Sequence, residues 1–303
     1  MKVAVIGAGG FVGSRVAGIL AGDPAIELSL LDRLAFPHPE SPRVKAVVGD
    51  FADPTVREKA LDGANKVILL AAILGGAAEA NYALARRVNV NATLGLFEFL
   101  RERAPGTRLV FASTIAVYSD RLPDPVIDAT ALGPTMVYGA QKLMMEVALS
   151  NFAVRGWLDG VSLRPSGIMA RDGADAALKT AFMSRLFWCV KRGEDIALPV
   201  APESRTWLTS IETVARNFIH AAMLPEIGPV RAFTLPALSL TFAELVAALK
   251  RRFPNSSSRI AFAPEPEIVA LFGSYPHLET ATADRLGFLR DETADVLVER
   301  ALS

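Results

Sequence analysis

A tyrosine and a lysine stand four residues apart in the segment Tyr138-Gly-Ala-Gln-Lys142. In a helix, side chains at this spacing lie on one face, about one turn apart. A nearby ammonium favours the phenolate form of tyrosine and so lowers the pKa of the phenol. Tyr138 could then accept the proton of an alcohol while a hydride leaves the same carbon. Such a pair also arises by chance, so other residues must support this chemistry.

Two adjacent hydroxyl groups, Ser113 and Thr114, follow the apolar run Leu109–Ala112. The run predicts a buried strand, and α/β sheets bind ligands at the carboxyl ends of their parallel strands. A hydroxyl can hydrogen-bond a reacting oxygen in both its alcohol and its carbonyl form. Ser and Thr at strand ends often only satisfy backbone groups. We expect one of the two to face a substrate.

A glycine-rich segment, Gly7-Ala-Gly-Gly10-Phe-Val-Gly13, separates a predicted strand, Val3–Ile6, from a predicted helix, Phe11–Ala21. In that context Gly7 can make the tight turn, Gly10 lets the backbone approach a pyrophosphate, and Gly13 permits close packing of helix on sheet. The helix N-terminus offers N–H groups to the anion. Glycine turns also occur in other βα connections, but this context predicts a dinucleotide.

An acidic residue, Asp32, follows Gly13 by nineteen positions, at the end of the second predicted strand. A carboxylate there accepts hydrogen bonds from both ribose hydroxyls of an adenosine and repels a 2′-phosphate. Arg33 could instead welcome that phosphate, but the carboxylate favours NAD over NADP. Asp50 and Phe51 follow the third predicted strand and could border the adenine.

The first half of the chain alternates short apolar runs with segments of helical period, which is typical of βαβ units and a parallel sheet. The expected strands are Val3–Ile6, Glu27–Leu31, Lys45–Val48, Val67–Ala71, Leu109–Ala112 and Gly160–Arg164, and the expected helices are Phe11–Ala21, Pro54–Leu61, Asn81–Glu102 and Val137–Arg155. The fold class is therefore α/β, with a doubly wound parallel (Rossmann) sheet. We interpret the apolar run Val67–Ala78 as a buried strand and its following loop.

After Pro165 the pattern becomes irregular, which indicates a smaller C-terminal α/β lobe for the substrate. We assign residues 1–165 to the dinucleotide-binding domain and 166–208 with 226–303 to the substrate lobe. Residues 209–225, which include the predicted helix Ile211–Leu224, are expected to pack back on the first domain.

The composition excludes several classes of partner. Lys plus Arg and Asp plus Glu both total 32, so no net charge attracts nucleic acid or an anionic membrane. The longest apolar run falls short of the roughly 20 residues of a membrane-spanning helix. No secretory cleavage site follows Met1, so we expect a cytoplasmic protein. The single cysteine, Cys189, is expected to be a buried inert thiol, and no cluster has metal-ligand spacing.

Taken together, the glycine segment, the Ser113-Thr114 strand ending in Val117-Tyr118, and Tyr138-x-x-x-Lys142 resemble the extended short-chain dehydrogenases. The resemblance implies that Thr114 is the catalytic hydroxyl, with Ser113 beside it. It also implies that Tyr138 is the general acid and base and that Lys142 holds the nicotinamide ribose. The implied cofactor contacts are Gly7, Gly10, Phe11, Val12, Gly13, Asp32, Asp50, Phe51, Leu70, Ala71, Ala72, Asn89, Tyr138, Lys142 and Pro165. The family's usual glycine after Asn-Val-x is Ala92 here.

The resemblance sharpens when the second lobe is included, because four segments are similar to the D-erythronate dehydrogenase group; these are Gly75–Glu79, Val161–Pro165, Glu203–Trp207 and Leu235-Pro236. The similarity implies oxidation of the 2-hydroxyl of a small sugar acid with NAD. Arg205 is then the first candidate to grip the substrate carboxylate, because a guanidinium binds both oxygens.

Gly75, Glu79, Thr114 and Trp207 complete the substrate candidates, although Arg205 could be a surface arginine, Glu79 a solvated residue and Trp207 part of the core. Gly75 replaces a serine of the group.

The segment Ser166-Gly167-Ile168 also departs from the group, and either departure could alter the acid recognised. The resembled family usually forms homodimers through helices near Asn81–Glu102 and Val137–Arg155, with Leu143, Met144 and Met145 as candidate contacts.

Two alternatives stay open from the sequence. A nucleotide-sugar epimerase or dehydratase shares the fold and the Tyr/Lys pair but retains its NAD through each cycle. A non-catalytic NAD-sensing regulator would bind the dinucleotide only to shift a partner equilibrium.

Overall fold

The computed structural model describes residues 1–173 and 181–303, which form two compact units. The first unit comprises residues 1–119, 131–164 and 215–234, and the second comprises 120–130, 165–214 and 235–303. The predicted domain ranges place 120–130 in the first domain and 226–234 in the second lobe. The strand Ala232–Thr234 belongs to the first unit because it pairs with its sheet. Residues 174–180, within the predicted range 166–208, lie outside the described residues.

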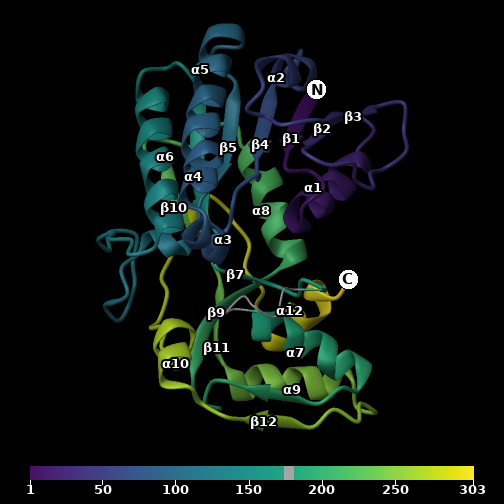
Figure 1. Cartoon of the computed structure of the whole chain (residues 1–303), viewed down its shortest axis with the longest axis vertical. Helices are drawn as coiled ribbons and strands as arrows, with labels where there is room; N and C mark the ends of the chain where they lie inside the picture. The colour runs from purple at the N-terminus through teal and green to yellow at the C-terminus, as the bar shows by residue number, and fades with distance from the viewer. Residues whose placement is uncertain (174–180) are drawn as a thin grey trace. The chain divides into compact units, whose positions relative to one another are not determined.

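Seven strands form a parallel sheet in the first unit, in the order β10-β6-β5-β4-β1-β2-β3 (Figure 1). They are β1 (Lys2–Ile6), β2 (Glu27–Asp32), β3 (Val44–Val48), β4 (Lys66–Leu69), β5 (Arg108–Ala112), β6 (Asp159–Arg164) and β10 (Ala232–Thr234). The strand order reverses at β1, whose Val5 lies between Leu30 of β2 and Ile68 of β4. The predicted doubly wound parallel sheet is confirmed.

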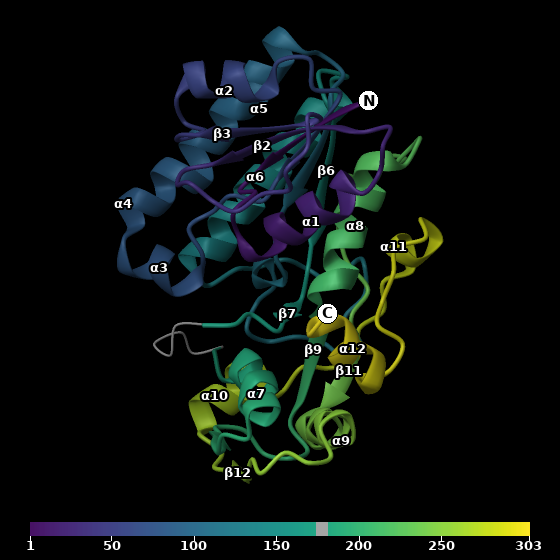
Figure 2. The ribbon, with the colours of Figure 1, turned by 90° about the vertical axis from the view of Figure 1, so that its right-hand side faces the viewer.

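Helices cover both faces of this sheet (Figure 2). Those of the first unit are α1 (Phe11–Ala21), α2 (Pro54–Leu61), α3 (Gly75–Ala80), α4 (Tyr82–Ala85), the π-helix η1 (Arg86–Ala92), α5 (Thr93–Arg103), the 3₁₀ turn η2 (Ile115–Val117) and α6 (Val137–Val154). Apolar side chains of α2, α5 and α6 pack on one face of the sheet, where Phe97, Phe111 and Leu149 are fully or almost fully buried. α8 (Ile211–Met223) contributes its later turns to this unit.

The local sequence explains most of these elements. α1 and α2 begin and end at the predicted residues, and Asp53 caps α2 by accepting a hydrogen bond from Thr55 N at 2.8 Å. Residues Gly75–Ala80, which the sequence assigned largely to a loop, form α3. Three of its six residues are alanines, the strongest helix formers. The predicted helix Asn81–Glu102 is helical from residue 82 to 103, but its middle is a π-helix.

The second unit has shorter strands and two smaller sheets. One has the order β11-β9-β7 and the other pairs β12 with β8. The strands are β7 (Gly167–Met169), β8 (Ile196–Leu198), β9 (Arg205–Ser210), β11 (Leu238–Thr241) and β12 (Ile260–Phe262), and the helices are α7 (Ala181–Arg192), α9 (Phe242–Arg252), α10 (Pro266–Phe272), α11 (Ala281–Arg285) and α12 (Ala294–Ala301). Leu245 and Leu249 of α9 join Leu297 and Val298 of α12 in its apolar core.

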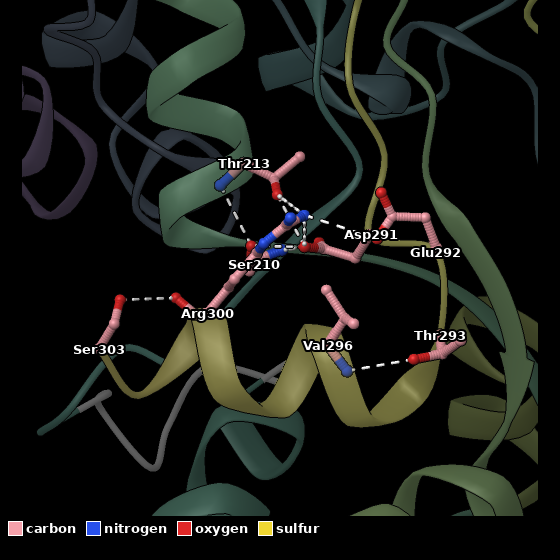
Figure 3. A network of polar contacts seen from close by, with 8 residues as sticks. All are labelled: Ser210, Thr213, Asp291, Glu292, Thr293, Val296, Arg300 and Ser303. Carbon is pink, nitrogen blue, oxygen red and sulfur yellow. Dashed lines mark hydrogen bonds and ion pairs between the residues drawn. The ribbon is translucent and has the colours of Figure 1, made fainter.

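A buried carboxylate holds the end of the chain to β9 in this unit (Figure 3). Asp291 is fully buried and accepts hydrogen bonds from Ser210 N at 2.7 Å, Ser210 Oγ at 2.9 Å and Thr213 Oγ1 at 2.7 Å. Arg300 of α12 lies 3.4 Å from the same carboxylate. Ser210 Oγ in turn accepts from Thr213 N at 3.1 Å, so Asp291 orders the first turn of α8.

Among the described residues, no helix is both long and apolar enough to cross a membrane, and no group of three or more His, Cys, Asp or Glu side chains could hold a metal ion. Cys189 of α7 is buried, and burial raises the pKa of its thiol.

Candidate active site

The glycine turn between β1 and α1 leaves no room for side chains. Gly7 has a φ of 88°, and a Cβ built there would lie 2.6 Å from Ala71 N, at the loop after β4. A Cβ on Gly13 would lie 2.0 Å from Gly7 O, so α1 reaches the turn only because residue 13 is glycine. Gly10 is the N-cap of α1, and Phe11 and Val12 form its first turn. This is the geometry of a helix N-terminus that receives a phosphate.

An acidic side chain lies beside this turn. Asp32 Oδ2 accepts a hydrogen bond from Gly9 N at 2.9 Å, and Oδ1 accepts from Arg33 N at 2.7 Å. These bonds fix the carboxylate, whose remaining lone pairs can accept from ribose hydroxyls. A dinucleotide therefore fits the residues present.

The other predicted adenine-side residues have defined contacts. Asp50 Oδ2 lies 3.2 Å from Arg87 Nη1, and Asp50 Oδ1 accepts from Ala52 N at 2.9 Å. Phe51 is 6% exposed and packs in the apolar core of the first unit. Its ring therefore supports the sheet end from inside the core.

A buried asparagine secures the loop after β4. Leu70 N and Ala71 N donate to Ile6 O, at 2.8 and 3.1 Å. The side chain of Asn89, on η1, then forms hydrogen bonds with both backbone groups of Ile73: it accepts from Ile73 N and donates to Ile73 O.

Asn89 Nδ2 also donates to Gln141 Oε1 at 2.9 Å. Sequence reasoning missed Gln141, although it directly precedes Lys142. The amide pair ties the loop that includes Ala72 to the helix of the tyrosine and lysine. The π-helix places Asn89 there, and π-helical turns are frequent at functional sites.

Tyr138 and Lys142 lie on α6, one turn apart. Lys142 is 2% exposed; its Nζ donates to Ala112 O at 2.6 Å and lies 4.5 Å from the centre of the Phe111 ring. The same nitrogen is 5.7 Å from the centre of the Tyr138 ring. The lysine is thus held between α6 and the end of β5, next to the tyrosine.

Two further residues set the position of α6. A Cβ on Gly139 would lie 2.0 Å from Ala116 O, so glycine allows α6 to approach η2. Glu79 Oε1 accepts from Val137 N at 2.7 Å and so caps the first turn of α6, directly before Tyr138. Gly75 begins the short helix of Glu79, and a Cβ on Gly75 would meet only Met136 Cε, at 3.8 Å.

The two hydroxyls after β5 differ in their surroundings. Thr114 is half-buried and is the N-cap of η2, with its Oγ1 accepting from Ala116 N at 3.1 Å. Its hydroxyl hydrogen is not used by that bond and can be donated. Ser113 is 3% exposed, and its Oγ has no hydrogen-bond partner among the described residues. A buried hydroxyl without a partner is unusual and marks a polar group that a ligand could satisfy.

Burial shifts the pKa values of both catalytic candidates. It raises the pKa of Tyr138 above its ordinary value. Burial lowers the pKa of Lys142 to about 7, and the negative charge of Glu146 opposes this shift. The charge state of Lys142 therefore changes near neutral pH, and a charged Lys142 favours the Tyr138 phenolate.

The remaining candidates belong to the second unit. Trp207 of β9 is 1% exposed, its Nε1 donates to Pro276 O at 2.7 Å, and its ring centre lies 4.8 Å from that of Tyr275. Pro165 also belongs to this unit. Tyr138, Lys142, Thr114 and the glycine turn all belong to the first.

Arg205, on the same strand as Trp207, is half-buried. Its guanidinium makes no hydrogen bond or ion pair to another described residue. The pKa of Asp124 is lowered chiefly by hydrogen bonds from His277, and Arg205 adds a smaller contribution. Arg205 similarly makes the smallest contribution to the lowered pKa of Glu244, after hydrogen bonds from Thr241. The guanidinium therefore lies near carboxylates of its own unit, and its N–H groups remain available to a further carboxylate.

The doubly wound sheet, the glycine turn beside Asp32 and the Tyr138-Lys142 helix define the class of the protein. It is an oxidoreductase that uses a nicotinamide cofactor and acts on CH–OH groups. The model of the NAD dependent epimerase/dehydratase family matches residues 3–226, and the chain belongs to this family.

Relatives extend the likeness over nearly the whole chain. D-erythronate dehydrogenase of Cupriavidus necator is 35% identical over 98% of this chain and 97% of its own length. The enzyme of the same name from Haemophilus influenzae is 30% identical, over 99% and 98%. Among solved structures, a nucleoside-diphosphate-sugar epimerase from Agrobacterium tumefaciens is 30% identical, with a TM-score of 0.88, and covers 98% of this chain and 92% of its own.

Proposed function

We propose that the protein is an NAD-dependent dehydrogenase that oxidises the 2-hydroxyl of a small sugar acid, with D-erythronate as the first candidate and 2-dehydro-D-erythronate as its product. The observation that carries this proposal is the likeness, over nearly the full length of each chain, to two D-erythronate dehydrogenases. The candidate site supports it, because Tyr138, Lys142 and Thr114 lie on neighbouring elements of one unit.

In the proposed reaction, Thr114 Oγ1 and Tyr138 Oη hold the hydroxyl of the substrate by hydrogen bonds. The Tyr138 phenolate takes the hydroxyl proton as the C2–H bond breaks, and the Lys142 ammonium stabilises that phenolate. A bound nicotinamide dinucleotide supplies the hydride acceptor. Gly7, Gly10 and Gly13 would hold its pyrophosphate and Asp32 its adenosine ribose, which favours NAD over NADP.

Arg205 is the proposed anchor for the substrate carboxylate. A guanidinium grips a carboxylate through two parallel hydrogen bonds, and that of Arg205 has none of these donors occupied by another described residue. If Arg205→Lys raises KM for the acid while kcat stays within about threefold, the anchor is supported, because a lysine cannot bind in the same bidentate way.

The decisive experiment is NADH absorbance with purified protein, NAD and a panel of C4 to C6 sugar acids that includes D-erythronate. A signal with D-erythronate supports both the reaction class and the substrate. No signal with any acid overturns the sugar-acid proposal.

A second candidate, nucleotide-sugar epimerisation, is favoured by the 30% identical epimerase structure. The two functions differ in the fate of the cofactor, because an epimerase regenerates its NAD in every cycle. Conversion of a UDP- or dTDP-sugar without accumulation of NADH would favour the epimerase.

We also propose a homodimer formed through α5 and α6. The exposed apolar side chains of α6 are Met144, Val147 and Val154, with exposed fractions of 54%, 64% and 82%. Of the contacts predicted from sequence, Met145 must be removed, because it is 3% exposed and packs in the core. A Met144→Glu/Val147→Glu variant that stays at the wild-type mass in light scattering would argue against this interface.

A further inference from the structure

A buried ion pair lies one helical turn beyond the catalytic lysine. Glu146 follows Lys142 by four residues on α6 and is 2% exposed. Arg164, at the end of β6, donates to both carboxylate oxygens of Glu146, from Nε at 2.9 Å and from Nη2 at 2.6 Å. This bidentate geometry gives the buried carboxylate a cationic partner in place of water.

The surroundings of Lys142 provide few groups that could stabilise its charged form. Its Nζ has one hydrogen bond among the described residues, to Ala112 O, and otherwise faces the Phe111 ring. A buried ammonium loses most of its hydration and becomes neutral unless an anion stabilises it. Glu146 is the acidic residue one turn along the same helix, where i and i+4 side chains are neighbours.

Among the described residues, no other titratable group around the lysine and the ion pair supplies such an anion. Tyr138 shares α6, and β5 contributes only a ring and a carbonyl group. Arg164 on β6 is a cation, and its guanidinium carbon lies 6.0 Å from the centre of the Tyr118 ring. Tyr118 Oη is hydrogen-bonded to Thr234 Oγ1 at 2.8 Å. The pair is therefore fixed from α6, β6, β10 and the end of η2.

We propose that Glu146, held ionised and in place by Arg164, is a positioning residue that keeps Lys142 protonated so that Lys142 can stabilise the Tyr138 phenolate. This inference rests on the proposed function and extends it by two residues that do not touch the reacting atoms. The negative charge of Glu146 accordingly raises the pKa of Lys142 against the lowering by burial.

The proposal predicts an order of pKa values for Lys142 in three proteins. The wild type has the highest value. Glu146→Gln has the lowest, because it removes the anion and leaves the Arg164 cation, and a single nearby charge typically shifts a pKa by about one unit or more. The double variant Glu146→Gln/Arg164→Met lies between them, because it loses the anion that favours the charged lysine together with the cation that opposes it.

The test is a pH titration of the lysine Cε signals by NMR on full-length protein labelled with ¹³C-lysine. The chain has only eight lysines, and loss of one signal in Lys142→Met assigns the signal of Lys142. This readout needs no substrate, so it can fail independently of the proposed function. Circular dichroism establishes that each variant is folded, and the double variant serves if Glu146→Gln does not fold.

Asp159→Asn provides a matched control. Asp159 lies at the other end of β6 and pairs with Arg108 and Arg231, both at 2.6 Å. Its negative charge raises the pKa of Lys66, which burial lowers. Asp159→Asn should therefore move the titration of Lys66 and leave that of Lys142 unchanged.

The expected result is a lower Lys142 midpoint in Glu146→Gln by about one pH unit, with the double variant intermediate. The alkaline limb of the kcat profile should move by the same amount, because oxidation requires charged Lys142. An unchanged Lys142 midpoint in the folded variants overturns the proposal, and so does a shift of equal size in Asp159→Asn.

Discussion

Each of the two units buries a carboxylate, and the two are satisfied in different ways. Glu146 in the first unit pairs with a guanidinium that is itself buried. Asp291 in the second unit accepts mainly from a backbone N–H and two hydroxyls, and its arginine is 3.4 Å away and partly exposed. The first arrangement places a full negative charge near Lys142. The second distributes neutral donors around a helix start, which orders the backbone. If the proposed role of Glu146 is correct, a buried acid supports chemistry in the first unit, whereas Asp291 supports folding in the second.

The largest effect is expected for the proposed catalytic tyrosine of the first unit. Tyr138→Phe should lower kcat by about 10³-fold, because it removes the group that takes the proton. The change deletes one oxygen from a half-buried side chain, so the melting temperature should change little. Steady-state kinetics with NAD and the best acid of the panel measures the effect. Tyr82→Phe, at an exposed tyrosine of the same unit, is the control; equal losses in both variants would remove Tyr138 from the mechanism.

Asp291→Ala tests whether the buried carboxylate of the second unit stabilises the fold. It leaves Ser210 N and two hydroxyls without their acceptor in a buried site, which should cost about 3 kcal/mol of unfolding free energy. Urea denaturation measures this cost. Asp295→Ala removes an exposed carboxylate paired with Arg251 and should cost much less, because exposed ion pairs are screened by solvent and contribute little to stability. Similar costs in the two variants would show that the buried network contributes no more than a surface pair.

Stability should also depend on the pH through Lys142. Burial lowers its pKa to about 7 in the folded protein, from the ordinary lysine value of 10.5 that applies to the unfolded chain. Between these values the unfolded chain binds more protons, so this lysine makes folding more favourable as the pH rises through the window. Below about pH 7 both states are protonated and the full penalty for a buried charge remains.

Lys142→Met lacks this titration, so its melting temperature should exceed that of the wild type most at pH 6 and least near pH 9.5. Differential scanning calorimetry at matched buffer strength gives the difference. A difference in melting temperature that does not change with pH would contradict the lowered pKa of Lys142. It would also weaken the contrast between the charged site of the first unit and the Asp291 network of the second.

The smallest expected effect concerns cofactor choice. Asp32→Ser should lower the preference for NAD over NADP by about tenfold, because it removes an acceptor for the ribose hydroxyls and a charge that repels a 2′-phosphate. The ratio of kcat/KM for the two cofactors measures it. Retention of the wild-type ratio would assign cofactor choice to other residues.

The sequence predicted the elements whose signals are local. The strand, glycine turn and helix around Gly7 to Gly13 follow from adjacent residues, and α1 and α2 have the predicted bounds. α3 was missed because its apolar alanines and glycines continue the preceding strand pattern without a polar boundary. The π-helical geometry of η1 was missed because its hydrogen-bond shift has no composition of its own.

The residues of the candidate site also divide into those that local sequence predicts and those that it does not. Tyr138, Lys142 and Asp32 could be named from their types and spacing. Gln141 and the pair of Glu146 with Arg164 could not, because their partners lie 52 and 18 residues away in the sequence. Nothing in the local pattern distinguishes Glu146 from a solvated glutamate on a helix.

The parallel sheet, the nucleotide-binding turn and the spacing of the tyrosine and lysine could be predicted from neighbouring residues, since each depends on their periodicity or conformational freedom. Long-range packing was needed to show that Lys142 is buried, that Glu146 is its neighbouring anion, and that Asp291, 81 residues after Ser210, orders α8. The charge state and the burial of a side chain depend on which distant segments exclude water from it, and those segments meet only when the chain packs.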